Sequence, residues 1–228
     1  MGKHLQRDLD DLKKDLLASG SMVEEAVNHA IDALVNRRTN LAEMVIEGDN
    51  AIDQKENQIE EECLKLLALH QPVAADLRFI ISALKVNNDL ERIGDLAANI
   101  AERALYLSTH EPLQATLNFP RMADGARNMV RKSLDALIQM DAELARVVLT
   151  LDDEIDNLNR EMYTTLQDLM RQSPESIDRA VHTLSVSRYL ERIADLSTNI
   201  AEDVVFMVEG GLIRHQKKER SKKNDQKR

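Results

Sequence analysis

Residues 90–105, LERIGDLAANIAERAL, return at residues 190–205 as LERIADLSTNIAEDVV, with ten of the sixteen positions identical. The correspondence extends upstream, where Ile31–Leu34 matches Leu134–Leu137 and Pro72 matches Pro174. The offset between the copies falls from 103 to 100 along the way, so the second copy is three residues shorter. A repeat of this extent predicts a duplicated structural unit.

The repeated segment has the periodicity of a helix. Ile93, Ala97 and Ile100 are spaced by four and three residues, which places them on one face. The prolines lie between such periodic segments and not inside them. Ser173 before Pro174 fits the N-cap and first position of a helix. The pattern predicts six helices over residues 4–37, 40–69, 73–108, 120–139, 142–172 and 175–208.

The composition supports an all-α fold. Aromatic residues make up 3% of the chain beside 43% hydrophobic residues, so we expect an aliphatic core. Four prolines and seven glycines in 228 residues are too few for the turns of an all-β sandwich. We expect two tandem, pseudo-symmetric three-helix bundles. The expected divisions are a first repeat over 1–111, a linker over 112–119, a second repeat over 120–213 and a basic, disordered tail over 214–228.

The charge and the distribution of apolar residues restrict where the protein can be located and which classes of partner it can bind. The net charge is −10, although the last 15 residues hold eight Lys or Arg against two Asp or Glu. The strongly acidic remainder argues against nucleic-acid binding. No apolar run is long enough to span a membrane, and the N-terminal residues lack the apolar segment of a signal peptide. The single cysteine, Cys63, is expected to be a buried, reduced thiol of a cytoplasmic protein.

Four acidic pairs with spacing i, i+4 occupy equivalent places in the two repeats. Such residues share a helix face, and their like charges repel unless something neutralises them. The stripe through Glu91, Asp95 and Glu102 lies opposite the buried stripe through Ile93, so we expect it to be exposed. If the second and third helices of each half are neighbours, the pairs converge into patches suited to Mg²⁺, Ca²⁺, Mn²⁺ or Fe³⁺. A solvated acidic face, copied by the duplication, explains the same spacing. The pairs are Asp49/Asp53, Glu91/Asp95, Asp152/Asp156 and Glu191/Asp195.

Other catalytic patterns are missing from the sequence. None of the six histidines forms Glu-x-x-His or His-Glu-x-x-His, and there is neither a P-loop nor a Gly-x-Ser-x-Gly elbow. We therefore do not expect an enzyme. Arg78 and Arg92 could bind an anion, although such arginines more often pair with acidic neighbours, here Asp76, Glu91 and Asp95.

Four segments resemble the PhoU family of bacterial phosphate-signalling regulators: 45–53 (VIEGDNAID), 72–80 (PVAADLRFI), 90–100 and 190–200. The resemblance extends to about residue 214 and departs from the family pattern at Ala194, where glycine is common, as at Gly94. It implies a cytoplasmic protein of two three-helix repeats with metal clusters of iron in some members and of Mg²⁺ or Mn²⁺ in others. The implied ligands are Asp49, Asp53, Glu91 and Asp95 at one site, and Asp152, Asp156, Glu191 and Asp195 at the other.

The resemblance also implies a function and partners. Such a protein limits phosphate uptake and negatively regulates the Pho regulon, without catalysis, by linking the ATPase subunit of the phosphate ABC transporter to a sensor histidine kinase. We expect a homodimer that reaches the membrane only through these partners. Three alternatives remain open: an accessory subunit of another phosphate permease, a carboxylate-bridged metal enzyme or metal store, and a plain helical scaffold.

Overall fold

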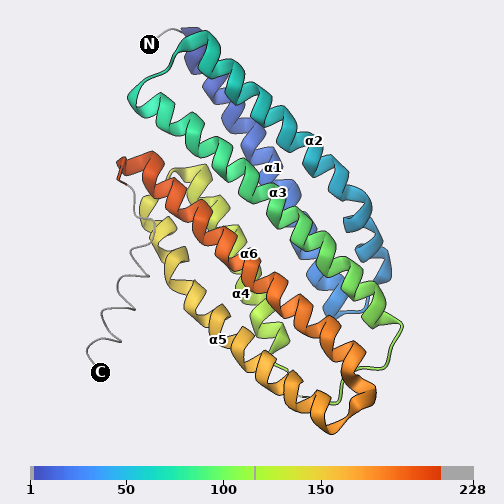
Figure 1. Cartoon of the computed structure of the whole chain (residues 1–228). Helices are drawn as coiled ribbons and strands as arrows, with labels where there is room; N and C mark the ends of the chain where they lie inside the picture. Colours follow the sequence, from blue (N-terminus) through green and yellow to red (C-terminus); the bar gives the residue numbers. More distant parts are fainter. Residues whose placement is uncertain (1–2, 116, 212–228) are drawn as a thin grey trace, which may run out of the picture.

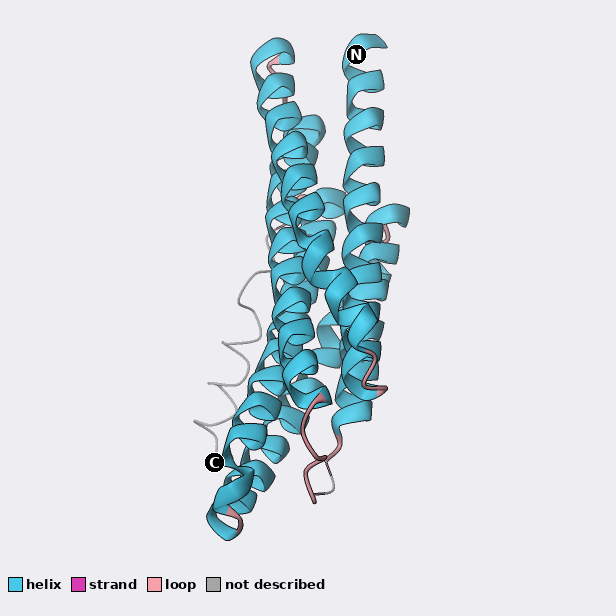
Figure 2. Cartoon of the chain, turned by 90° about the vertical axis from the view of Figure 1, so that its right-hand side faces the viewer, coloured by secondary structure: helices cyan, strands magenta, loops and turns pink. Residues whose placement is uncertain are grey.

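The computed structural model describes residues 3–115 and 117–211, and the predicted basic tail over 214–228 lies outside the described residues. Within this part of the chain all regular structure is helical, which confirms the all-α prediction. The axes of the long helices are roughly aligned, with neighbours running up and down, in two perpendicular views (Figure 1, Figure 2). Their bounds are α1 Lys3–Val35, α2 Thr39–His70, α3 Ala74–Ser108, α4 Phe119–Gln139, α5 Ala142–Gln172 and α6 Ile177–Glu209.

The six helices form two three-helix groups that meet along α3 and α6. Helices α1, α2 and α3 pack against one another, as do α4, α5 and α6, which confirms the predicted neighbours. Helices α3 and α6 lie side by side and antiparallel at the centre of Figure 1, and α1 also touches α4. The ERIxD segments, at 91–95 and 191–195, are therefore in the middle of the molecule.

The core is aliphatic, as the composition predicts. Ile93, Ala97 and Ile100 are fully buried on α3, and the side chains of Ile155 and Leu158 are buried on α5. Each of these stripes lies on one face of its helix, because residues three or four apart in a helix share a face. Cys63 belongs to the same core with no exposed surface, and burial raises the pKa of its thiol to about 12.

The helix ends show how local sequence sets the boundaries. Asp141 precedes α5, and its carboxylate accepts hydrogen bonds from the backbone N–H groups of Glu143 (2.9 Å) and Leu144 (3.0 Å). Such an N-cap satisfies two donors that have no partner inside the helix. Helix α6 ends at Glu209 and is followed by Gly210, whose φ of 75° lies in the left-handed region that glycine adopts at low cost.

Ser173 lies at the predicted cap position and Pro174 at the first helical position, but the helix that they start is not the expected α-helix. Residues Pro174–Ser176 form a short 3₁₀ turn, η1, and the Ser173 side chain does not cap it. Helix α6 begins only at Ile177, and the backbone N–H (2.9 Å) and the hydroxyl (2.7 Å) of Ser176 both donate to the Ser173 carbonyl within the preceding 3₁₀ turn.

None of the helices in the described ranges is both long enough and apolar enough to cross a lipid bilayer.

Candidate metal site

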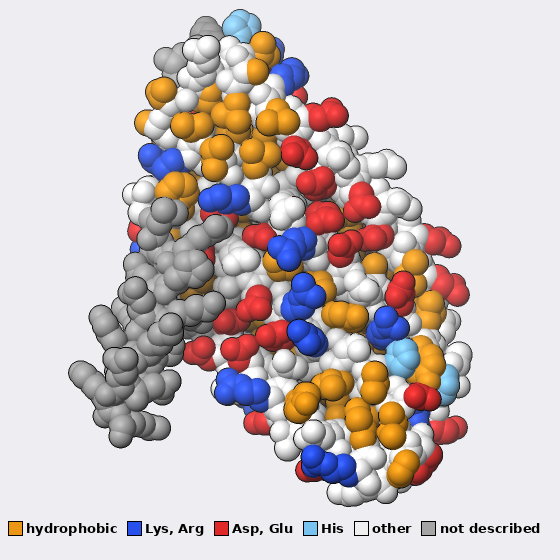
Figure 3. Space-filling model, in the orientation of Figure 1, with side chains coloured by type: hydrophobic (Ala, Val, Ile, Leu, Met, Phe, Trp, Pro, Cys, Tyr) orange, Lys and Arg blue, Asp and Glu red, His pale blue; other side chains and the backbone are white. Residues whose placement is uncertain are grey.

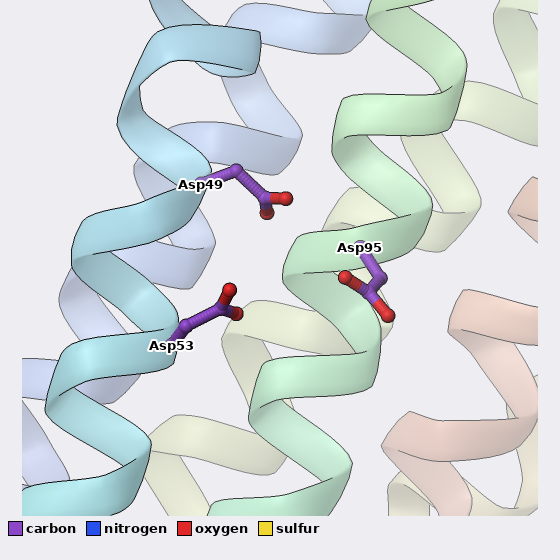
Figure 4. A group of neighbouring side chains, drawn as sticks. All are labelled: Asp49, Asp53 and Asp95. Atoms are coloured by element: carbon purple, nitrogen blue, oxygen red, sulfur yellow. The ribbon is translucent and has the colours of Figure 1, made fainter.

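Three carboxylates from α2 and α3 meet on the surface of the first repeat. Asp49 and Asp53 come from α2 and Asp95 from α3, and each contributes an oxygen atom within 4.8 Å of the other two. Figure 4 shows the two α2 carboxylates pointing across the gap between the helices toward the α3 side. We call these three residues the acidic triad. Asp49 and Asp53 are half-buried, whereas Asp95 is exposed.

A glycine lets α2 and α3 approach closely beneath the acidic triad. A Cβ atom at Gly94 would lie 3.1 Å from Cδ1 and 3.2 Å from Cγ2 of Ile52, closer than ordinary side-chain contacts. Ile52 directly precedes Asp53, and Gly94 directly precedes Asp95. The buried contact therefore helps to set the distance between the acids above it.

The acidic triad is electrostatically strained when no cation is present. Burial raises the pKa of Asp49, and the charges of Asp95 and Asp53 raise it further. Burial and Asp53 likewise raise the pKa of Asp95, while Arg92 opposes this shift. Each shift means that the folded protein holds these groups in their charged form at a cost in free energy. A bound cation would remove that cost.

Glu91, the fourth predicted ligand of this site, lies beside the acidic triad and outside it. Burial raises the pKa of Glu91, followed by the charges of Asp95, Asp53 and Glu56. Glu91 is half-buried, so the prediction of a fully exposed acidic stripe is wrong at this residue. The cause is the neighbouring α2, which covers one side of α3.

One acidic neighbour was missed in the sequence. Glu56 lies three residues after Asp53 on α2, and its charge contributes to the raised pKa of Glu91. Burial, Glu60 and Asp53 raise the pKa of Glu56 itself. The sequence did contain a signal for Glu56, because a residue three positions after Asp53 lies on the same helix face.

The second repeat places its predicted ligands on equivalent helices with a different spacing. Asp152 and Asp156 are on α5, and Glu191 and Asp195 are on α6. Burial raises the pKa of Glu191, and the other three acids raise it further, so all four are electrostatic neighbours. Within the described ranges, however, no three of them bring oxygen atoms within 4.8 Å of one another.

The packing beneath the two acid groups gives a physical reason for this difference. Ala194 carries a methyl group at the position that corresponds to Gly94. Ile155, the counterpart of Ile52, directs its Cδ1 atom toward Gly125 of α4. The close approach that Gly94 permits in the first repeat therefore meets an added methyl group at the equivalent position of the second.

The acidic triad fits a hard cation. All its donors are carboxylate oxygens, which Mg²⁺, Mn²⁺ and Ca²⁺ prefer. Metal–oxygen distances of about 2.0–2.6 Å allow two ligand oxygens of one ion to be at most about 4–5 Å apart. The oxygen atoms of the triad, within 4.8 Å of one another, reach this range.

The fold and the acidic groups define a class of protein: a duplicated helical bundle that carries clustered carboxylates on its surface. A PhoU domain model matches residues 16–104 and 119–204. The chain belongs to the PhoU family.

Named relatives and a solved structure agree with this assignment. A phosphate-specific transport system accessory protein PhoU homolog from Pseudomonas putida is 42% identical over 94% of this chain and 84% of its own length. Its counterpart from Aquifex aeolicus is 39% identical over 93% and 96%. The crystal structure of PhoU from Pseudomonas aeruginosa superposes with a TM-score of 0.88 at 39% identity, covering 90% of this chain and 99% of that one.

Proposed function

We propose that this protein is a non-enzymatic accessory regulator of phosphate uptake. The support is its membership of the PhoU family, together with relatives that are named as accessory proteins of a phosphate-specific transport system and cover most of the chain. The structural observation that carries the mechanism is the acidic triad, in which three carboxylates meet with raised pKa values for Asp49 and Asp95.

We propose that metal ions bind at both acid groups. Asp49, Asp53, Glu91 and Asp95 would hold one site and Asp152, Asp156, Glu191 and Asp195 the other, with Mg²⁺, Mn²⁺ or Fe³⁺ as the ion. The carboxylates themselves would supply the negative charge and fix α2 relative to α3, and α5 relative to α6. A bound cation would neutralise the repulsion and stabilise this arrangement.

The regulatory step would then be a change in protein contacts. We propose that the two repeats, 1–111 and 120–213 joined by the linker 112–119, present a rigid surface to the ATPase subunit of the phosphate ABC transporter and to a sensor histidine kinase. The protein would act in the cytoplasm as a homodimer, reach the membrane only through these partners and keep the Pho regulon repressed when phosphate is plentiful.

Metal analysis tests the chemical part of this proposal. Protein purified without chelator should contain bound metal, and an Asp95→Ala/Asp195→Ala double variant should lose most of it. The matched control is Asp124→Ala/Asp168→Ala, which removes two exposed carboxylates of α4 and α5 that pair with arginines. If wild-type protein binds no Mg²⁺, Mn²⁺ or Fe³⁺ in an equilibrium titration, the metal sites are refuted.

Affinity capture and gene deletion test the biological part. The tagged protein should retain the transporter ATPase subunit and the kinase from cell extract. Deletion of its gene should leave phosphate-starvation genes expressed in phosphate-rich medium. Full repression of those genes in the deletion strain would contradict the regulatory role.

A further inference from the structure

A cleft of about 310 Å³ opens where α3 crosses α6. Its lining consists of four residue pairs, one member from each helix, and the members of every pair are 100 positions apart. A leucine pair forms its apolar part. The polar pairs are Arg92/Arg192, Asp95/Asp195 and Asn99/Asn199.

The antiparallel crossing places equivalent residues opposite each other. Because α3 and α6 run in opposite directions (Figure 1) and carry the same motif, a pseudo-twofold axis passes through the cleft. The lining therefore offers the same guanidinium and the same amide from two sides. Figure 3 shows Lys and Arg side chains along the middle of this face, between two groups of acidic side chains.

The two arginines of the cleft are available for a ligand. Both are exposed, and neither guanidinium forms a hydrogen bond or an ion pair with another residue in the described part of the chain. Arg127 and Arg146, in contrast, pair with Asp32 and Glu209. The charge of Arg92 nevertheless opposes the rise in the pKa of Glu91 and of Asp95, so the expected pairing exists as an electrostatic interaction without a direct ion pair in the described part of the chain.

The asparagines add neutral donors at the same place. Asn99 is half-buried and donates one amide proton to the backbone carbonyl of Asp95 at 2.7 Å, which fixes the side chain and leaves its second proton. Asn199 occupies the equivalent position on α6. Guanidinium and amide N–H groups that converge from two sides are suited to the several acceptor oxygens of an oxyanion.

We propose that this cleft binds a small oxyanion, of the phosphate or sulfate type, between Arg92 and Arg192. The charges of Asp95 and Asp195 balance those of the two arginines while no cation is bound. This inference rests on the proposed metal sites, because cations held by the two aspartates would leave the arginines dominant. The oxyanion should therefore bind more tightly to metal-loaded protein than to chelator-treated protein.

Calorimetric titration with inorganic phosphate, with sulfate and chloride for comparison, tests the cleft. The full-length protein is titrated in the presence of Mg²⁺ and after treatment with chelator, and Mg²⁺ binding is measured separately. The variant Arg92→Gln/Arg192→Gln should weaken phosphate binding about tenfold or more, since each lost contact is a charge-assisted hydrogen bond. The control Arg131→Gln/Arg171→Gln removes two exposed arginines of α4 and α5 and should leave the affinity unchanged.

The outcomes separate the cleft from the metal sites. Phosphate binding that needs the arginine pair, with Mg²⁺ binding unchanged in the arginine variant, supports the proposal. Equal phosphate affinity of the arginine variant and wild type overturns it, because the anion would then sit directly on the metal. Mg²⁺ binding without any phosphate binding also overturns it and leaves the proposed function standing. Arginine-dependent phosphate binding by protein that takes up no metal would refute the metal sites and overturn the proposed dependence of the cleft on a cation.

Discussion

Replacing Asp49 by asparagine should stabilise the metal-free protein. Asparagine keeps the shape of the side chain and removes one of three charges whose oxygen atoms lie within 4.8 Å of one another. The raised pKa of Asp49, caused by burial and by Asp95 and Asp53, shows that the folded state disfavours this charge. Loss of the charge should therefore favour folding.

The magnitude follows from the separation of the charges. Two unit charges 4.8 Å apart repel by about 0.9 kcal/mol in a water-like medium, and Asp49 has two such partners. At physiological ionic strength the Debye length of about 8 Å reduces this repulsion by roughly half. The net gain is about 1 kcal/mol, which corresponds to an increase in Tm of about 2–4 °C for a chain of this size.

Thermal and urea unfolding of chelator-treated protein measure this effect. The control is Asp168→Asn on α5, where the carboxylate is 3.0 Å from Arg171, so its loss should be neutral or slightly destabilising. With Mg²⁺ added the order should reverse. Wild type gains about 2.7 kcal/mol when the free ion concentration is 100 times Kd, and Asp49→Asn should gain less.

Two results would refute this reasoning. A chelator-treated Asp49→Asn variant that unfolds at lower temperature than wild type would mean that the three carboxylates do not repel in the folded state. An equal Mg²⁺-dependent rise in Tm for variant and wild type would mean that Asp49 holds no ion.

Four further measurements test other parts of the structure. The Tm difference between chelator-treated wild type and Asp49→Asn should grow from about pH 4 to pH 7, because a raised pKa contributes stability at low pH that is lost as pH rises through it; a constant difference would exclude the charge as its cause. Gly210→Ala should lower the free energy of unfolding by about 1–2 kcal/mol, since its φ of 75° is strained for alanine, and an unchanged urea midpoint would contradict this. Asp141→Ala should lower the free energy of unfolding by about 1 kcal/mol, because it removes the N-cap of α5, whereas Asp141→Asn should keep most of the stabilisation that the cap provides. Cys63 should react with a thiol reagent only after unfolding, because burial raises its pKa to about 12; rapid reaction of the native protein would show that the core around it opens.

The sequence predicted the helices well where apolar spacing was regular. The stripe through Ile93, Ala97 and Ile100 faces the core as expected, because a single helix already fixes which residues share a face. The start of α6 was predicted less well, since Ser173 and Pro174 suit both an α-helix and the 3₁₀ turn that forms there. Local composition does not distinguish these two, because the same residues can form either the i→i+3 bonds of a 3₁₀ turn or the bonds of an α-helix.

The candidate site was predictable only in its residue types and spacing. Asp49, Asp53 and Asp95 could be placed on two faces that would meet if their helices were neighbours, and the structure brings them together. Their counterparts Asp152 and Asp156, equal in spacing, do not form an equally close group with Glu191 or Asp195 within the described ranges. Spacing along one helix cannot report the distance to another helix.

By itself the sequence determined the helices, the duplication and the registration of the acidic pairs, because these depend on periodicity and on identity at a fixed offset. The tertiary structure decided two further matters. Contact between Gly94 and Ile52 brings α2 close to α3 beneath the three carboxylates, whereas the second repeat carries Ala194 at the position of Gly94. The antiparallel crossing of α3 and α6 turns two identical arginines, 100 residues apart, into the facing walls of one cleft. Both depend on distances between helices, and side-chain packing, which no single segment encodes, sets those distances.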